Sequence, residues 1–168
     1  MNALALPQLA MRPMLAADVP LLAEIFRAAI EELTIEDYSP AQQEAWASAA
    51  DDEAAFGAKL SGALTLVATQ SGSAVGFGSL AGNSRIDMLY VHPAAAGQGV
   101  GAMLCDALEK LAAARGAKEL AVDASDAALG FFEHRGFKPK SRNTITLGGE
   151  WIANTTMTKT LPAKESAS

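Results

Sequence analysis

The chain has 168 residues, half of them hydrophobic, and its 13 basic and 19 acidic residues give a formal charge of −6 at pH 7. A chain of this length can bury a sizeable core without disulfides or a structural metal. Its single cysteine excludes an internal disulfide, and one cysteine with two histidines is a poor set of zinc ligands. No stretch reaches the roughly 20 apolar residues of a membrane helix, and a net acidic chain is a poor nucleic-acid binder.

The N-terminal part is predicted to be a strand followed by two or three helices. Asp18 and Pro20 form a start signal for a first helix. Ser39 and Pro40 repeat that signal for a second helix, and a third is predicted over residues 52–59. The first helix has apolar residues at helical spacing, namely Leu22, Ile25, Phe26, Ala29, Ile30 and Leu33.

The rest of the chain is predicted to alternate between strands and helices. Expected strands are residues 64–70, 75–81, 86–91 and 119–123, a strand after Gly136, and a final hairpin of residues 144–147 and 151–159. Helices are expected after Gly101, ending at a left-handed Gly116, and over residues 126–134. The order is β-α-α-(α)-β-β-β-α-β-α-β-β, which predicts an α/β fold of the α+β type with a mixed, largely antiparallel sheet flanked by helices. We expect one domain at residues 9–161, with flexible tails at 1–8 and 162–168.

Negative charge is concentrated in one interval. Between Arg27 and Lys59 there is no Lys or Arg, while the interval contains Glu31, Glu32, Glu36, Asp37, Glu44, Asp51, Asp52 and Glu53. If these side chains share a face, their potential would attract a cationic ligand. The alternative is that they are solvated helix faces that serve solubility.

A glycine-rich loop follows the strand at residues 86–91. Gly97, Gly99 and Gly101 lead into a helix, whose free N–H groups and dipole favour an anion such as a pyrophosphate. A loop needed only for the turn is the alternative. A P-loop is excluded because Ala102 stands where a lysine is required, and a Rossmann loop because three strands precede this one.

Two motifs give the sequence a resemblance to a known family. Residues 86–93, IDMLYVHP, run into Gly97-Gln98-Gly99-Val100-Gly101, and residues 131–137 read FFEHRGF. Together they resemble the GNAT superfamily of acyl-CoA-dependent N-acyltransferases over roughly residues 9–160. The end of the chain, from Arg142 to Lys159, is similar to a subgroup of bacterial acetyltransferases.

The resemblance implies an acetyl-CoA site. According to this resemblance, the pyrophosphate is held by main-chain amides of the loop, namely those of Gly97, Gln98, Gly99, Val100 and Gly101. The strand residues Leu89, Tyr90 and Val91 border the pantetheine, and an N–H near Leu89 faces the thioester oxygen. The resemblance also places Ser125 and Phe132 at the cofactor. Ser125 either forms a hydrogen bond with pantetheine or caps the following helix.

Two positions depart from the family pattern. Ala96 replaces the Gln or Arg at the start of the loop, which removes a side-chain contact but no backbone amide. Phe132 replaces the tyrosine that protonates the departing thiolate in many relatives. Since a thiol has a pKa of about 8.5, departure as a thiolate is chemically tolerable near neutral pH.

The amine that attacks must be neutral, so an alkylammonium acceptor needs a base. Asp87 is the first candidate, because alternation would put it on the same face as Leu89 and Val91, and an ion pair with Arg85 or a neighbouring strand is the alternative. Tyr38 is a candidate acid or a pocket wall. The resemblance places its segment at the acceptor pocket, where Glu31, Glu32 and Asp37 are candidates to attract the amine.

Cys105, Trp46 and Trp151 are expected to have structural roles. We expect Cys105 to be a small buried core residue, and the two tryptophans to pack in the core or to form pocket walls.

The sequence therefore predicts an acetyl-CoA-dependent N-acetyltransferase that acts on a primary amine of a small molecule or peptide by direct attack in a ternary complex. A non-catalytic acyl-CoA-binding regulatory module is the alternative from another class, and a pure interaction domain is a third. We expect no metal, no nucleic-acid or membrane partner, and a cytoplasmic location, because the apolar N-terminus lacks the basic residues of a secretory signal. The C-terminal hairpin could pair across a homodimer.

Overall fold

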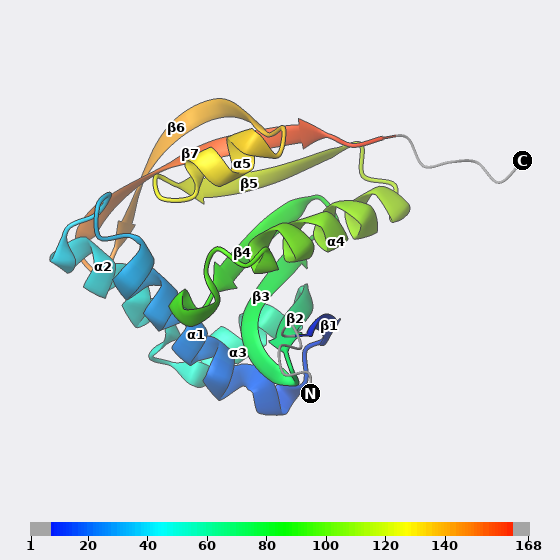
Figure 1. Ribbon diagram of the computed structural model, residues 1–168. Coiled ribbons are helices and arrows are strands. Elements are labelled where there is room, and N and C mark those ends of the chain that lie inside the picture. Colours follow the sequence, from blue (N-terminus) through cyan, green and yellow to red (C-terminus); the bar gives the residue numbers. More distant parts are fainter. Residues whose placement is uncertain (1–7, 163–168) are drawn as a thin grey trace, which may run out of the picture.

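The computed structural model describes residues 8–162 (Figure 1). The elements follow the predicted order: β1 (Leu9–Pro13), α1 (Val19–Leu33), α2 (Pro40–Ala47), α3 (Glu53–Ser61), β2 (Leu64–Gln70), β3 (Ser73–Ala81), β4 (Arg85–Val91), α4 (Val100–Ala114), β5 (Glu119–Ser125), α5 (Leu129–His134), β6 (Lys138–Leu147) and β7 (Glu150–Thr160). Apart from Gln8 and Pro162, the predicted tails lie outside the described residues.

One seven-stranded sheet connects the two halves of the chain in the order β1-β2-β3-β4-β5-β7-β6. Every neighbouring pair is antiparallel except β4 and β5, which are parallel. The predicted mixed, largely antiparallel sheet is confirmed. The parallel pair is short: only Arg85 and Ile86 of β4 have partners on β5, and the two strands separate beyond them.

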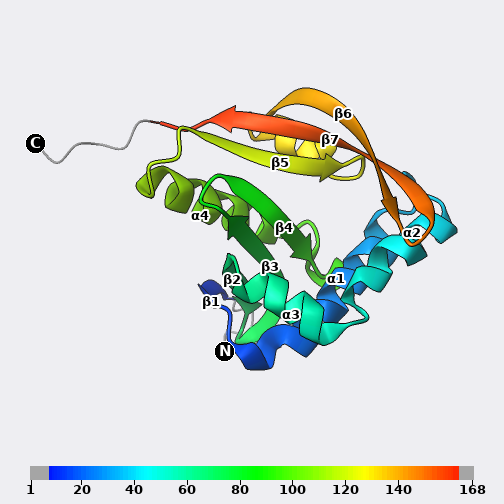
Figure 2. The ribbon, with the colours of Figure 1, turned by 180° about the vertical axis from the view of Figure 1, so that it is seen from behind.

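Helices cover both faces of the sheet. One core joins α1 and α3 to the sheet through Phe26, Phe56 and Phe77, and Figure 2 shows α3 in front of the lower end of β3. On the opposite face α4 and α5 form a second core, which includes the fully buried Cys105 and Leu108. The predicted core position of Cys105 is confirmed.

The helix start signals are partly confirmed. Ser39 caps α2: its hydroxyl accepts a hydrogen bond from the Gln42 N–H at 3.1 Å, and the Gln42 side chain accepts one from the Ser39 N–H at 2.8 Å. Asp18 is the N-cap residue of α1, as predicted, but its side chain makes no capping hydrogen bond to the helix. Its carboxylate accepts from the Leu15 N–H and from Arg12, so it holds the turn before the helix.

Two boundaries differ from the predictions. Helix α5 begins at Leu129 instead of 126. Residues 125–128 form a turn, in which the Asp126 N–H donates to the Tyr38 hydroxyl and the Ala128 N–H donates to the Ser125 hydroxyl and carbonyl. The expected separate strand after Gly136 is the first part of β6, which pairs with β7 along its length across an irregularity at Lys140. A long ladder with one bulge replaces the two short strands.

Within residues 8–162 no helix is long and apolar enough to cross a bilayer, and no three His, Cys, Asp or Glu side chains gather as a metal site would require.

Candidate active site

The loop between β4 and α4 has the conformation that its glycines allow. Gly97 and Gly99 have φ values of +76° and +84°, a region that residues with a Cβ rarely adopt. Gly99 stands directly before the first residue of α4. A Cβ at either glycine would meet no atom within 4 Å, so backbone conformation, and not lack of space, requires glycine here.

The N–H groups of this loop are left free by the rest of the chain. The Ala95 and Ala96 N–H groups donate to the His92 and Pro93 carbonyls, and the Met103 N–H donates to the Gly99 carbonyl. Among the described residues, no protein group accepts from the N–H groups of residues 97–102. Six main-chain donors therefore remain available at the positive end of the α4 dipole.

The edge of β4 beside β5 is also unpaired after Ile86. The His92 N–H donates to the Val75 carbonyl on β3 at 2.8 Å, and strand alternation directs the Tyr90 N–H to the same side. The N–H groups of Leu89 and Val91 then point away from β3, into the space where β5 has separated from β4. A ligand in that space can pair with β4 as an additional strand.

A bulge at Asp87 changes the face on which its side chain lies. In the pairing of β3 with β4, Leu80 opposes Ile86 and Ser79 opposes Met88, so Asp87 is the extra residue. Its carboxylate lies 3.6 Å from the Lys59 ammonium on α3. Leu89, by contrast, packs towards α4. The expectation that Asp87 shares a face with Leu89 and Val91 is therefore wrong, and its ion-pair partner is Lys59 instead of Arg85.

A cavity of about 670 Å³ occupies the space between the separated strands. Residues 85–91 of β4 and 122–125 of β5 line its length, and Gly101, Phe131 and Phe132 line the end near the glycine loop. The opposite end lies between α1, α2, α3 and the β6–β7 hairpin. Its apolar lining consists of Phe26, Ala29, Ile30, Leu33, Trp46, Ala49, Ala55, Phe56, Ile145, Leu147 and Ile152.

A family model of the acetyltransferase (GNAT) domain matches residues 34–161. The chain belongs to the GNAT acetyltransferase family. It is 35% identical, over 82% of its length and 86% of the relative's, to the uncharacterized N-acetyltransferase YafP of Escherichia coli. The resemblance found in the sequence is confirmed at the level of family, and the chain is classed with the N-acetyltransferases.

Solved structures agree with this assignment. A GCN5-related N-acetyltransferase from Rhodopseudomonas palustris is 60% identical, with a TM-score of 0.90 over 96% of this chain and 99% of that one. The PaiA N-acetyltransferase of Thermoplasma acidophilum, solved in complex with coenzyme A, is 19% identical, with a TM-score of 0.75 over 91% of this chain and 99% of that one. The second likeness shows the GNAT fold alone.

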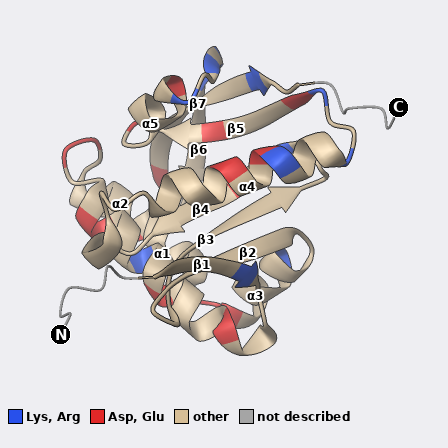
Figure 3. Ribbon diagram, turned by 45° about the vertical axis from the view of Figure 1, so that its right-hand side comes forward, with Lys and Arg blue, Asp and Glu red and all other residues tan. Residues whose placement is uncertain are grey.

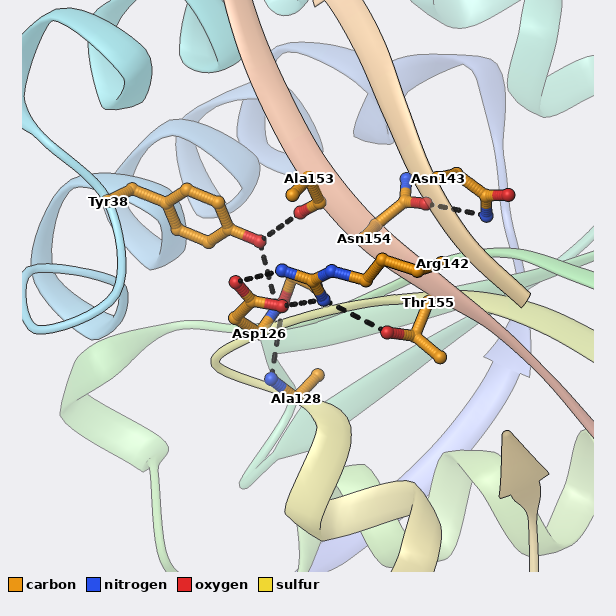
Figure 4. A network of polar contacts seen from close by, with 9 residues as sticks. Tyr38, Asp126, Ala128, Arg142, Asn143, Ala153, Asn154 and Thr155 are labelled. Carbon is orange, nitrogen blue, oxygen red and sulfur yellow. Dashed lines mark hydrogen bonds and ion pairs between the residues drawn. The ribbon is translucent and has the colours of Figure 1, made fainter. Parts of the chain in front are cut away.

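In this GNAT chain, Tyr38 joins three segments at the side of the cavity (Figure 4). Its hydroxyl donates to the Ala153 carbonyl on β7 at 2.7 Å and accepts from the Asp126 N–H at 2.8 Å. Burial, as the largest effect, raises the pKa of this phenol. The hydroxyl proton is therefore donated to the Ala153 carbonyl. The predicted catalytic role of Tyr38 stays a prediction.

The neighbouring turn fixes Ser125 and the end of β5. The Ser125 hydroxyl accepts from the Ala128 N–H at 3.2 Å, within the turn before α5, so it does not cap the helix itself, whose N-cap residue is Ala128. Ser125 also lines the cavity. Arg142 on β6 donates to both oxygens of the Asp126 carboxylate and to the Thr155 hydroxyl, as Figure 4 shows. The turn after β5 is thus held on two sides by polar contacts.

Phe132, which the sequence resemblance assigns to the position of a family tyrosine, is buried. Its ring packs edge-on against Phe131 at 5.1 Å and Phe137 at 5.2 Å, measured between ring centroids. Phe132 is 3% exposed and borders the cavity. The side chain therefore contributes an apolar wall and has no proton to transfer.

The acidic residues predicted to attract an amine lie outside the cavity. Glu31, Glu32 and Asp37 are exposed, and none of them lines it. Figure 3 shows acidic positions on the helices and connections of the N-terminal half, whereas β2 and β3 carry no charged residue. These carboxylates therefore act on a ligand inside the cavity through their long-range field, and not by contact.

Of the two tryptophans, Trp46 lines the cavity as expected, whereas Trp151 is 70% exposed, so the expectation that it packs is wrong. Sequence reasoning also missed cavity walls. Phe26 and Ile30 were recognised only as apolar helix positions, and Ile145 and Ile152 only as strand residues. No local signal distinguishes an apolar residue that faces a cavity from one that faces a filled core.

Proposed function

We propose that this chain transfers an acetyl group from acetyl-CoA to a primary amine by direct attack, while both substrates are bound. The observation that supports this most is the row of free N–H groups at residues 97–102, at one end of a cavity that continues along the open edge of β4. Cofactor and acceptor then enter one continuous space, as a direct transfer requires.

The glycine loop fits the pyrophosphate of coenzyme A. Gly97 and Gly99 leave room for a close approach, and N–H donors at a helix start are suited to phosphate oxygens. The side chain of Gln98 is held to one side, because its amide oxygen accepts from Gln70 at 2.6 Å. When bound, acetyl-CoA supplies the acetyl group as an activated thioester.

Residues of β4 orient the reacting groups in this proposal. The N–H groups of Leu89 and Val91 point into the space between the strands, where the Val91 N–H pairs with a pantetheine carbonyl. The Leu89 N–H stabilises the negative charge that develops on the carbonyl oxygen as nitrogen attacks. Because these donors belong to a strand paired with β3, they need little reorganisation during the reaction.

The proton and the leaving group have separate routes. The new C–N bond forms as the C–S bond breaks, and the nitrogen loses one proton, for which Asp87 is the proposed acceptor. Phe132 provides no acid, so the sulfur leaves as a thiolate, which is tolerable for a thiol with a pKa of about 8.5.

Two measurements on the full chain test this function. Calorimetry should detect coenzyme A binding, and free thiol should accumulate above the uncatalysed rate when acetyl-CoA and a suitable amine are present. Binding without thiol release, for every amine of a broad panel, would favour the regulatory acyl-CoA-binding module. Absence of coenzyme A binding would overturn the site assignment itself.

A cytoplasmic location and a homodimer stay predictions. β6 is an edge strand of the sheet, which leaves its outer side open to a partner. The strand carries Lys138, Lys140 and Arg142, and basic residues on an edge oppose strand pairing between copies. Light scattering on the purified chain decides between monomer and dimer.

A further inference from the structure

We infer that the acceptor is an apolar amine of low basicity, of the arylamine class, and not a polycation such as a polyamine. This inference rests on the acetyl transfer proposed above. It is carried by the side chains at the end of the cavity away from the glycine loop, and by the charges along its length.

The first observation is a connected group of aromatic rings on the acceptor side. The centroid of the Phe26 ring lies 4.7 Å from that of Tyr90 and 5.3 Å from that of Phe56, and the Tyr38 and Trp46 rings lie 5.5 Å apart. All five residues line the cavity. Walls of this kind favour a flat apolar ligand, which gains both buried area and edge-to-face contacts.

The entrance has the same character. Leu33 and Ile145 both line the cavity, yet they are 45% and 39% exposed, so an apolar rim leads from solvent to the interior. The β6–β7 hairpin is held over α2 by a 2.7 Å hydrogen bond from the Gln42 side chain to the Trp151 carbonyl. A polycation that passes this apolar rim would lose hydration against walls that offer it no polar group.

The second observation is that the charges of the cavity cancel. Among residues 8–162, its lining contains four charged side chains, in two pairs: Lys59 with Asp87 at 3.6 Å, and Arg85 with Asp123. The Thr156 hydroxyl also donates to Asp123, at 2.7 Å. The cavity therefore offers a polycation no unpaired carboxylate. An added ammonium would compete with Lys59 for Asp87 and would be repelled by the positive charges of Lys59 and Arg85.

The chemistry of the transfer agrees with these walls. An arylamine is neutral at pH 7, because its nitrogen lone pair is delocalised into the ring, so it can attack without being deprotonated first. The nitrogen then loses its proton after attack, to Asp87 or to water. A strongly basic amine would instead need a free base before attack, and Asp87 is already paired with Lys59.

Two isomeric amines and one polycation test the inference. Thiol release from acetyl-CoA is measured at neutral pH with 4-ethylaniline, with 2-phenylethylamine, which has the same formula but is basic, and with spermidine. We expect kcat/KM for 4-ethylaniline to exceed that for 2-phenylethylamine by about tenfold and that for spermidine by about 100-fold. A preference for either basic amine, or equal values for the isomers, would overturn the inference and leave acetyl transfer intact. Absence of thiol release with every amine tested would overturn the proposed function.

A pair of variants on α1 assigns the preference to the cavity rim. Leu33→Glu places a carboxylate at the entrance, whereas Leu21→Glu changes a leucine of the same helix that is 41% exposed and does not line the cavity. Leu33→Glu should lower kcat/KM for 4-ethylaniline by about tenfold with an unchanged KM for acetyl-CoA, while Leu21→Glu changes it less than about twofold. Equal effects of the two variants would remove the rim from acceptor recognition.

Discussion

The hydroxyl of Tyr38 accepts a hydrogen bond from the main-chain N–H of Asp126 at 2.8 Å and donates one to the Ala153 carbonyl at 2.7 Å. One side chain thereby joins the connection after α1 to the turn after β5 and to β7. These three segments border the cavity, so the contact links separate parts of the cavity wall.

Tyr38→Phe should therefore act on stability first. The change leaves a partly buried N–H and a partly buried carbonyl without their partner, and we expect a loss of about 1–3 kcal/mol in the free energy of unfolding, measured in urea. Because burial raises the pKa of Tyr38, its phenol stays protonated at neutral pH, and the pH–rate profile should keep its shape. A fall in kcat of about 100-fold with unchanged stability would instead make Tyr38 a catalytic acid.

Gly99→Glu should reduce coenzyme A affinity by about 100-fold, because it places bulk and negative charge beside the free N–H groups. Gly82→Glu is the matched control: both glycines have positive φ, at +84° and +57°, and neither would bring a Cβ within 4 Å of another atom. Similar losses of stability are expected from both variants, but only Gly99→Glu should weaken binding in calorimetry. Equal coenzyme A affinities for the two variants would contradict the assignment of the loop.

Asp87→Asn should separate acceptors by their basicity. With 2-phenylethylamine, which must lose a proton before attack, we expect kcat to fall by about 10²-fold or more, whereas the fall with 4-ethylaniline should be far smaller. The affinity of the Asp87→Asn variant for coenzyme A should equal that of the wild type. Lys59→Met, which removes the ion-pair partner of Asp87, should raise kcat/KM for 2-phenylethylamine. An unchanged pH–rate profile and kcat in Asp87→Asn would remove Asp87 from proton transfer.

The stability of the chain should depend on Asp18 in acid. Hydrogen bonds from Arg12, the largest effect, lower the pKa of this carboxyl in the folded state. A lowered folded-state pKa adds stability above the unfolded value of about 3.9, and that stability is lost as pH falls through the folded-state pKa. The difference in unfolding free energy between the wild type and Asp18→Asn should therefore be constant near neutral pH and shrink below about pH 4.

Arg12→Met provides the matching measurement for this pair. Without the guanidinium, the Asp18 carboxyl loses the largest cause of its lowered pKa, so the acid-dependent part of the stability should shrink as it does in Asp18→Asn. A wild-type acid dependence in Arg12→Met would mean that the Leu15 N–H, not Arg12, holds the carboxylate.

Local chemistry predicted much of the fold. The capping pair of Ser39 and Gln42, the left-handed Gly116 after α4 and the change from helical to strand periodicity near residue 64 depend on neighbours within a few residues. The glycine loop belongs to the same class, because its free N–H groups follow from three glycines and a helix start. The sequence alone therefore predicted the order of elements, the family and the loop that we assign to the cofactor.

Contacts between distant residues decided the acceptor side. The bulge that turns Asp87 towards Lys59 depends on how β3 pairs with β4, and the outward position of Glu31 and Glu32 depends on how α1 lies on the sheet. Phe26 and Ile152 follow the same apolar pattern whether they fill a core or border a cavity, because periodicity records which face is apolar and not what that face meets. Only the tertiary structure, which separates β4 from β5 and brings α1, α3 and β7 around the gap, made an apolar cavity with balanced charges.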